Sequence, residues 1–225
     1  MRTKTLQPPP NIDAELNTLD ASALPTWDAP ADAAGAKAAR RHLRTVARRR
    51  FARLEQHAAA IRHLDPLPAP GESLHGVMDG RFSAWSLATA IVDLLDEPVD
   101  QLTISTLGFN RENAASLIEL LDAGKVREVL LNVSNYFRHS DRTIFADIRR
   151  ELESRGQRVV VTRSHAKLIL LRTATRSIVV ESSANLRSSQ NYEQFLISDD
   201  AALLDFHRTW IEELATATEE TCNEQ

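Results

Sequence analysis

The alternation of hydrophobic and polar positions divides residues 72–215 into helical and extended segments. Apolar residues three and four positions apart predict helices over residues 82–95, 111–121, 141–154 and from 199 or 200 to about 215. Short β-branched or leucine-rich runs predict strands over residues 101–107, 126–133, 158–162, 166–171, 177–180 and 195–197. Strands that alternate with helices predict an α/β domain with a mixed, mostly parallel sheet flanked by helices.

The ends of the chain follow different patterns. Residues 1–32 are rich in Pro, Ala and Asp, and we expect them to form a disordered arm. Residues 33–64 are rich in Ala and Arg and contain no Pro, which favours a basic helix. The Pro-rich residues 65–71 indicate a linker, and the polar residues 216–225 indicate a frayed tail.

Charge is distributed unevenly along the chain. The whole chain has a net charge of −4, yet residues 33–63 carry nine Lys and Arg side chains against one Glu. Such a block can contact nucleic acid, or it can dock on an acidic face of its own protein. Four arginines in this block are candidate nucleic-acid contacts: Arg40, Arg41, Arg44 and Arg48.

Composition favours a cytoplasmic protein. Charged residues make up 26% of the chain and hydrophobic residues 43%, which is ordinary for a globular domain. The single cysteine, Cys222, cannot form an internal disulfide. The sequence has no apolar run of about 18 residues and no apolar segment behind its N-terminal charges, so we expect neither a membrane span nor a signal peptide.

Polar residues suited to phosphate chemistry lie near the ends of the last predicted strands. His165 and Lys167 are two positions apart and share one face of a strand, and Asn185 and Glu193 follow. A neutral imidazole can attack phosphorus, and an ammonium group and a side-chain amide can bind phosphate oxygens. A carboxylate can hold the imidazole in one tautomer. A His-x-Lys pair by itself is better explained as a solvated strand end, but together these residues indicate a phosphoryl-transfer site.

Three short segments resemble the HKD signature of the phospholipase D superfamily: His165-Ala166-Lys167, Ser183-Ala184-Asn185 and Asn191-Tyr192-Glu193. The sequence departs from that signature at Arg172, where the family has Asp, and at Ser182, where it has Gly. The resemblance extends over residues 72–215 and implies one phospholipase D-like half with a single motif.

The resemblance implies a phosphodiesterase that uses neither metal nor cofactor. His165 would attack the phosphorus, with Lys167, Asn185 and Ser183 binding the substrate and Glu193 holding the imidazole. A second histidine would protonate the leaving oxygen. Because the chain carries one motif, the resemblance implies a homodimer that shares one active site.

Two further residues are candidates for substrate binding because they follow a predicted strand, where ligand sites in open α/β sheets gather. Tyr136 can stack on a base and Arg138 can contact phosphate, although a packed loop explains both residues as well.

The basic block favours a nuclease acting on DNA or RNA over other phosphodiesterases. One alternative is a member that binds nucleic acid or protein without turnover, which Arg172 and Ser182 support. A second alternative is a lipid phosphodiesterase, against which the lack of an amphipathic membrane helix counts.

Overall fold

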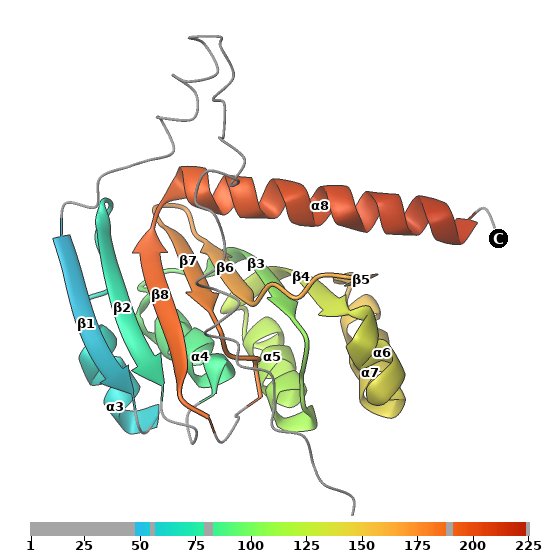
Figure 1. Ribbon diagram of the computed structural model, residues 1–225, viewed down its shortest axis with the longest axis horizontal. Coiled ribbons are helices and arrows are strands. Elements are labelled where there is room, and N and C mark those ends of the chain that lie inside the picture. The colour runs from blue at the N-terminus through green and yellow to red at the C-terminus, as the bar shows by residue number, and fades with distance from the viewer. Residues whose placement is uncertain (1–47, 55–56, 79–82, 188–190, 224–225) are drawn as a thin grey trace, which may run out of the picture. The chain divides into compact units, whose positions relative to one another are not determined.

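The computed structural model describes residues 48–54, 57–78, 83–187 and 191–223 (Figure 1). Its strands are β1 (Arg48–Leu54), β2 (Glu72–Met78), β3 (Val99–Thr106), β4 (Val126–Ser134), β5 (Arg158–Thr162), β6 (Leu168–Arg172), β7 (Ser177–Ser182) and β8 (Glu193–Asp199). Its helices are α3 (His57–Leu64), α4 (Ala84–Leu94), α5 (Arg111–Asp122), α6 (Asn135–Ser140), α7 (Arg142–Glu153) and α8 (Ala201–Asn223). Every helix and strand predicted between residues 82 and 215 is present, with its ends shifted by a few residues.

The described strands form one eight-stranded sheet in the order β1-β2-β8-β7-β6-β3-β4-β5. Three neighbouring pairs are parallel, namely β1 with β2, β3 with β4 and β4 with β5. The other pairs are antiparallel. The sheet is therefore mixed as predicted, but the prediction that it is mostly parallel is wrong. The strands from β6 to β8 follow one another without a helical crossover, so each runs back against its predecessor.

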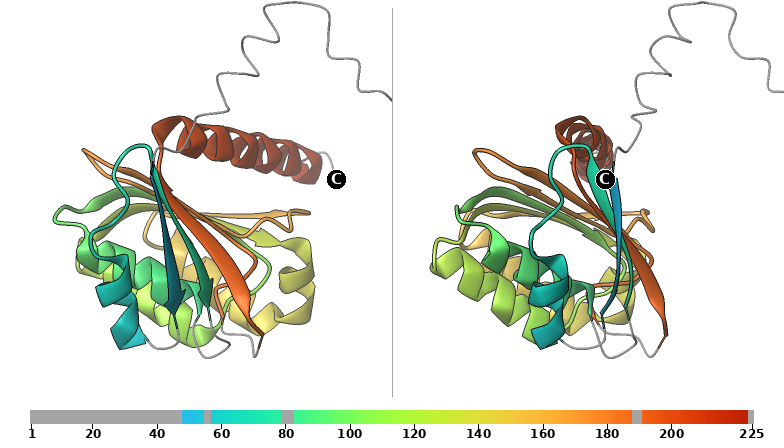
Figure 2. Two further views of the ribbon diagram at one scale, coloured as in Figure 1. Left: turned by 60° about the vertical axis from the view of Figure 1, so that its left-hand side comes forward. Right: turned by 90° about the vertical axis from the view of Figure 1, so that its left-hand side faces the viewer.

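Helices flank the sheet on both faces, as predicted (Figure 2). On one face the larger core joins Leu87 and Ile91 of α4 and Leu117 of α5 to inward-facing strand residues such as Ile104 and Val180. On the other face α8 packs a smaller core, in which its buried residues Leu204, Ile211 and Ala215 meet strand residues Leu130, Val160, Leu170 and Val179. Strand residues alternate between the two cores with the two-residue period of an extended chain.

His207 of α8 contacts Trp210 of the same helix and Glu181 of the sheet. The indole nitrogen of Trp210 donates a hydrogen bond to Nδ1 of His207 at 3.0 Å. Because an indole only donates, Nδ1 carries no proton, and the neutral ring carries its proton on Nε2. Nε2 lies 3.3 Å from a carboxylate oxygen of Glu181 on β7, although not in hydrogen-bond alignment. The contact with His207 lowers the pKa of Glu181 below its ordinary value.

The segment before β2 differs from its prediction. Arg48–Leu54 was expected within a basic helix, but it forms β1 and pairs in parallel with the whole of β2. The prediction rested on helix propensity. The backbone hydrogen bonds that this segment forms along the edge of β2 outweigh that propensity. Only His57–Leu64 of the expected helix is helical among the described residues. The expected arm over residues 1–32, and residues 33–47, lie outside the described residues.

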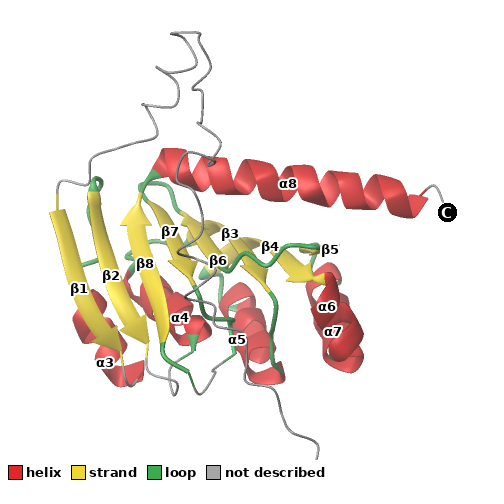
Figure 3. Ribbon diagram, viewed as in Figure 1, coloured by secondary structure: helices red, strands yellow, loops and turns green. Residues whose placement is uncertain are grey.

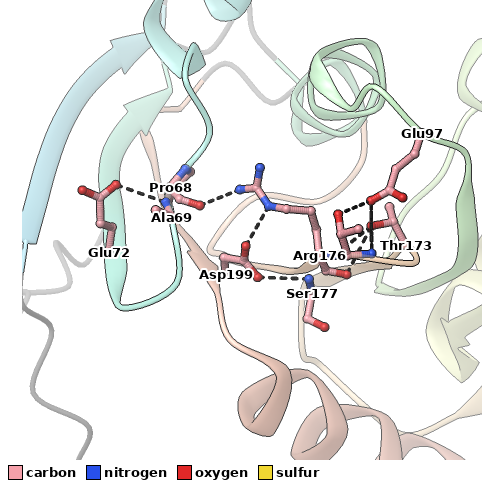
Figure 4. Close-up of polar contacts among 9 residues, drawn as sticks. Pro68, Ala69, Glu72, Glu97, Thr173, Arg176, Ser177 and Asp199 are labelled. Atoms are coloured by element: carbon pink, nitrogen blue, oxygen red, sulfur yellow. Dashed lines mark hydrogen bonds and ion pairs between the residues drawn. The ribbon is translucent and has the colours of Figure 1, made fainter.

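The residues of the expected linker, 65–71, belong to the same compact unit as the sheet. Leu67 is buried, and the carbonyl of Pro68 accepts a hydrogen bond of 2.6 Å from Arg176 (Figure 4). Arg176 also forms an ion pair of 2.7 Å with the buried Asp199. Nearby, hydrogen bonds from Thr173 and from the neighbouring Thr175 lower the pKa of Glu97. The two contacts of Arg176 tie the segment before β2 to the β6–β7 hairpin and to β8, and those of Glu97 tie the segment before β3 to the same hairpin.

Within the expected frayed tail, residues 216–223 are helical, because α8 continues to Asn223, and residues 224–225 lie outside the described residues. No Gly or Pro interrupts residues 201–223, so the sequence offers no helix stop there.

Candidate functional site

The topology brings the ends of six strands to one edge of the sheet, which we call the motif edge (Figure 3). Since β3, β4 and β5 are parallel, all three end at this edge. Since β6 runs against β3, it begins here; β7 then ends here and β8 begins here. Five predicted site residues lie at this edge: His165, Lys167, Ser183 and Asn185 in the loops between these strands, and Glu193 at the start of β8.

The two halves of the sequence motif meet directly at the motif edge. The backbone N–H of Ser182 donates to the carbonyl of Lys167 at 3.1 Å, which extends the β6–β7 ladder by one step. The N–H of Ser183 donates to the carbonyl of Gln194 at 3.0 Å on the other side. Adjacent strands therefore bring the His-x-Lys segment, the Ser-x-Asn segment and the start of β8 together.

His165 is exposed in the loop between β5 and β6. Lys167 is a half-buried residue, and its ammonium group donates to the backbone carbonyl of His165 at 3.2 Å. The imidazole ring of His165 makes no hydrogen bond to any residue that the structure describes. The ring is thus open to solvent and to a ligand, next to a cationic side chain.

Asn185 is half-buried and bridges the motif loop to the end of β3. Its side-chain oxygen accepts a hydrogen bond of 3.2 Å from the N–H of Leu107. Since a backbone N–H can only donate, the side-chain oxygen must face it, and the amide nitrogen points elsewhere. Within the part of the chain that the structure describes, the amide nitrogen makes no hydrogen bond, so its two N–H groups can donate to a ligand such as a phosphate oxygen.

Glu193 contacts Ser183 rather than His165 within one chain. The Ser183 hydroxyl donates to the Glu193 carboxylate and accepts a hydrogen bond of 3.0 Å from the N–H of Gln194. No hydrogen bond joins Glu193 to His165 in the described part of the chain. The expected support of the imidazole by Glu193 thus stays a prediction.

The two departures from the family signature have structural roles. Arg172 forms an ion pair with Asp205 of α8 and lies at the end of β6 opposite the motif edge. The Ser182 hydroxyl accepts from the N–H of Ala184 at 2.9 Å and donates to the carbonyl of Gln194 at 3.1 Å. Ser182 thereby stabilises the turn that presents Ser183 and Asn185.

The other predicted substrate-binding and nucleic-acid-binding residues lie outside the loops that carry the motif. Tyr136 and Arg138 lie exposed on α6, which follows β4 at the motif edge, so the expected loop is a short helix. Ser134 caps this helix by accepting from the N–H of Tyr136 at 3.2 Å. Arg48 lies in β1, whereas Arg40, Arg41 and Arg44 lie outside the described residues.

A hollow next to the motif was not predicted as a site. It has a volume of about 630 Å³ and lies on the face of the sheet that carries α8, beside Ser182 and Ser183. His75 of β2, Glu181 of β7 and Gln194 of β8 line it. The only residue of this hollow that the sequence could have marked as a candidate is His75. Because side chains alternate along β2, His75 lies on the same face of the sheet as its hydrogen-bond partner Ser73.

Two further features bear on what the site can bind. The residues that the structure describes contain no group of three or more His, Cys, Asp or Glu side chains arranged to hold a metal ion. Among the described helices, none combines the length and the apolar character needed to cross a membrane.

Comparison with known proteins gives a distant likeness only. No protein-family model and no curated protein matches the sequence. Polyphosphate kinase from Porphyromonas gingivalis matches 66% of this chain and 28% of its own, with a TM-score of 0.47 and 15% identity. Phosphatidylserine synthase from Haemophilus influenzae matches 63% of this chain and 37% of its own, with a TM-score of 0.46 and 15% identity. At this level neither structure identifies the family, so the function must be inferred from the site.

Proposed function

We propose that the protein is a metal-independent phosphodiesterase of the HKD type, which cleaves DNA or RNA through a phosphohistidine at His165. The observation that supports this proposal is the convergence at the motif edge. The backbone carbonyl of Lys167 accepts a hydrogen bond from Ser182, and Asn185 follows three residues later, with its amide nitrogen making no hydrogen bond to the residues that the structure describes. A nucleophile, a cation and an amide donor are the groups that a phosphate diester needs.

The chemistry follows from these groups. The imidazole of His165 attacks the phosphorus, and the bond from phosphorus to the leaving oxygen breaks. Lys167 and the amide of Asn185 stabilise the negative charge that develops on the non-bridging oxygens. Water then attacks the phosphohistidine, so the bond between phosphorus and nitrogen breaks and the imidazole is restored.

A second histidine is needed to give the leaving oxygen its proton. His207 is unsuited, because its two ring nitrogens face Trp210 and Glu181. A second copy of His165 across a two-fold axis supplies this acid, because an isologous dimer brings the same surface of both subunits together. The exposure of His165 at the motif edge is compatible with such a shared site.

The departures from the signature do not by themselves favour a binding module without turnover. Arg172 lies away from the motif edge, and Ser182 uses its hydroxyl within the turn. The basic block over residues 33–63 favours nucleic acid as the substrate class, since such a block attracts the phosphate backbone.

The test is to incubate the pure full-length protein with labelled DNA, RNA and phosphatidyl lipid in the presence of EDTA. We expect hydrolysis of a nucleic acid, and a ³²P label that is retained on the protein in acid-labile form. His165→Ala should abolish both signals. His63→Ala is the matched control, because His63 is exposed on α3. Hydrolysis of lipid alone would identify the lipid enzyme, and binding without hydrolysis would identify the non-catalytic module.

A further inference from the structure

A chain of buried polar groups runs beneath the loop that carries His165. Asn132 of β4 is 0% exposed, although it stands in an otherwise apolar run. Its amide nitrogen donates to the hydroxyl of Ser105 on β3 at 3.1 Å, and its oxygen accepts from the hydroxyl of Thr162 on β5 at 2.8 Å. Ser105 and Thr162 are also buried, at 2% and 3% exposure. The three side chains thus span the ends of three parallel strands.

Both ends of this chain bind the residues on either side of His165. At one end the Ser105 hydroxyl donates to the carbonyl of Ala166 at 3.1 Å. At the other end the Thr162 hydroxyl accepts from the N–H of Ser164 at 3.2 Å. The Ser164 hydroxyl in turn accepts from the N–H of Ala166 at 3.1 Å. The backbone is therefore held immediately before and immediately after His165, while the ring itself stays exposed.

The donor and the acceptor of each hydrogen bond among these buried side chains are fixed. The carbonyl of Ala166 can only accept, so the single hydroxyl proton of Ser105 points at it. The amide of Asn132 must then present its nitrogen to Ser105 and its oxygen to Thr162. A carboxylate, which only accepts, or an aliphatic side chain, which does neither, cannot replace an amide that donates on one side and accepts on the other.

Burying three polar side chains is costly unless all of them are satisfied, and an apolar trio would pack in the same place. We propose that Asn132 is a positioning residue, which fixes the loop 163–167 through Ser105 and Thr162 and so sets the place of the His165 imidazole. The catalytic part of this inference rests on the proposed function, whereas the effect on the loop does not. A displacement of about 1 Å in a nucleophile can lower a rate by about 100-fold.

The test compares Asn132→Leu with Asn113→Leu in the full-length protein. Asn113 is also a buried asparagine, at 6% exposure, but it lies on α5 and not in this chain of bonds. Backbone amide hydrogen exchange is measured by NMR. We expect the amides of Ser164 and Ala166 to exchange about tenfold faster or more in Asn132→Leu, and to be unaffected in Asn113→Leu.

A second variant covers the case in which Asn132→Leu does not fold. Thr162→Val keeps the shape of the side chain and removes one hydroxyl, and it should release the amide of Ser164 in the same way. Unchanged exchange at Ser164 and Ala166 in a folded Asn132→Leu or Thr162→Val protein would overturn the proposal.

A kinetic measurement tests the link to catalysis. If the protein hydrolyses nucleic acid, Asn132→Leu should lower kcat by about tenfold to 100-fold and change KM by a much smaller factor, since Asn185, which also binds phosphate, lies outside the loop 163–167. A variant with a loosened loop and full kcat would refute the positioning role. If wild type shows no hydrolysis, the proposed function fails, and the exchange experiment still decides whether Asn132 holds the loop.

Discussion

The side-chain oxygen of Asn185 accepts a hydrogen bond from the backbone N–H of Leu107, 3.2 Å away, at the end of β3. The two residues are far apart in sequence, and the pairing of β6 with β3 brings them together. This bond turns the amide nitrogen of Asn185 away from the N–H of Leu107. It thereby divides the side chain into an anchoring half and a half that can donate to phosphate.

Mutation can separate the anchoring role of the Asn185 side-chain oxygen from the donor role of its amide nitrogen. Asn185→Asp keeps an acceptor for Leu107 but replaces the two donors with negative charge, so we expect hydrolysis to fall by about 100-fold or more at an unchanged melting temperature. Asn185→Ala also removes the anchor, so it should lower the melting temperature as well. Steady-state kinetics and thermal unfolding measure the two effects. An active Asn185→Asp variant would remove this amide from the proposed mechanism.

Glu193 can act through Ser183 or on an imidazole, and mutation distinguishes the two roles. We expect Glu193→Gln to lower kcat by about tenfold or more with little change in KM, because stabilisation of an imidazolium matters mainly in the transition state. Ser183→Ala removes the hydroxyl that donates to this carboxylate. If both variants and the double variant lose the same activity, Glu193 acts only through Ser183, and its role at the imidazole is refuted.

The sequence predicts the motif region well because its strands are local features. The runs over 158–162 and 177–180 are β-branched, and both form strands with nearly the predicted bounds. Residues 168–182 form a hairpin, so the meeting of Lys167 with Ser182 follows from neighbouring strands. Local pattern and local pairing agree there, and prediction succeeds where they agree.

The failures concern pairings between distant segments. The residues of Arg48–Leu54 do not show that the edge of β2 is open for pairing. Helix propensity therefore wrongly predicted a helix for this strand. The direction of β6 against β3 is likewise set by contacts across the whole domain. Asn132 was overlooked because one Asn in an apolar strand carries no sign of the two hydroxyls that neighbouring strands bring to it.

The strand β1 begins at Arg48, inside the basic block, which changes how the block should be tested. A deletion of residues 1–64 would remove β1 and the buried Leu64, so unfolding would mask any effect on binding. We instead predict that changing Arg40, Arg41 and Arg44 to Gln makes the slope of log K against log salt on duplex DNA shallower, by about 0.9 for each phosphate that is no longer neutralised.

The matched control changes the same three arginines to Lys, which keeps the charge and should keep the slope. Binding is measured by fluorescence anisotropy over a series of salt concentrations. An equal slope for the Gln variant and wild type would mean that these arginines do not contact nucleic acid.

The contact between Glu181 and His207 predicts a dependence of stability on pH. His207 lowers the pKa of Glu181 from its ordinary value of 4.5, so the folded state favours the carboxylate. The resulting stability is present above pH 4.5 and is lost as the pH falls through the lower folded-state pKa. Glu181 is partly exposed, so we expect Glu181→Gln to cost roughly 0.5 kcal/mol at pH 7 and nothing in strong acid.

Urea unfolding followed by tryptophan fluorescence measures this difference, because Trp210 contacts His207 directly. Glu213→Gln is the control, since Glu213 is an exposed carboxylate on the same helix. A cost of Glu181→Gln that stays constant from pH 7 to strong acid would contradict the assignment.

The last prediction concerns the second histidine. If two copies of His165 share one site, every active dimer needs both of them. Wild-type and His165→Ala subunits are refolded together in equal amounts so that they pair at random. Only dimers with two intact histidines should hydrolyse the substrate, so we expect about one quarter of the activity of the same amount of wild type.

Other values of this activity identify other arrangements. About one half of the wild-type activity would mean that each chain has a complete site of its own. The acid would then come from the same chain, and His75 would be the residue to change next, because it lines the hollow beside Ser182 and Ser183. Sedimentation of the active protein as a monomer would reject the shared site in the same way. A value near one quarter, from a protein that sediments as a dimer, is the result that the single motif and the exposed His165 predict.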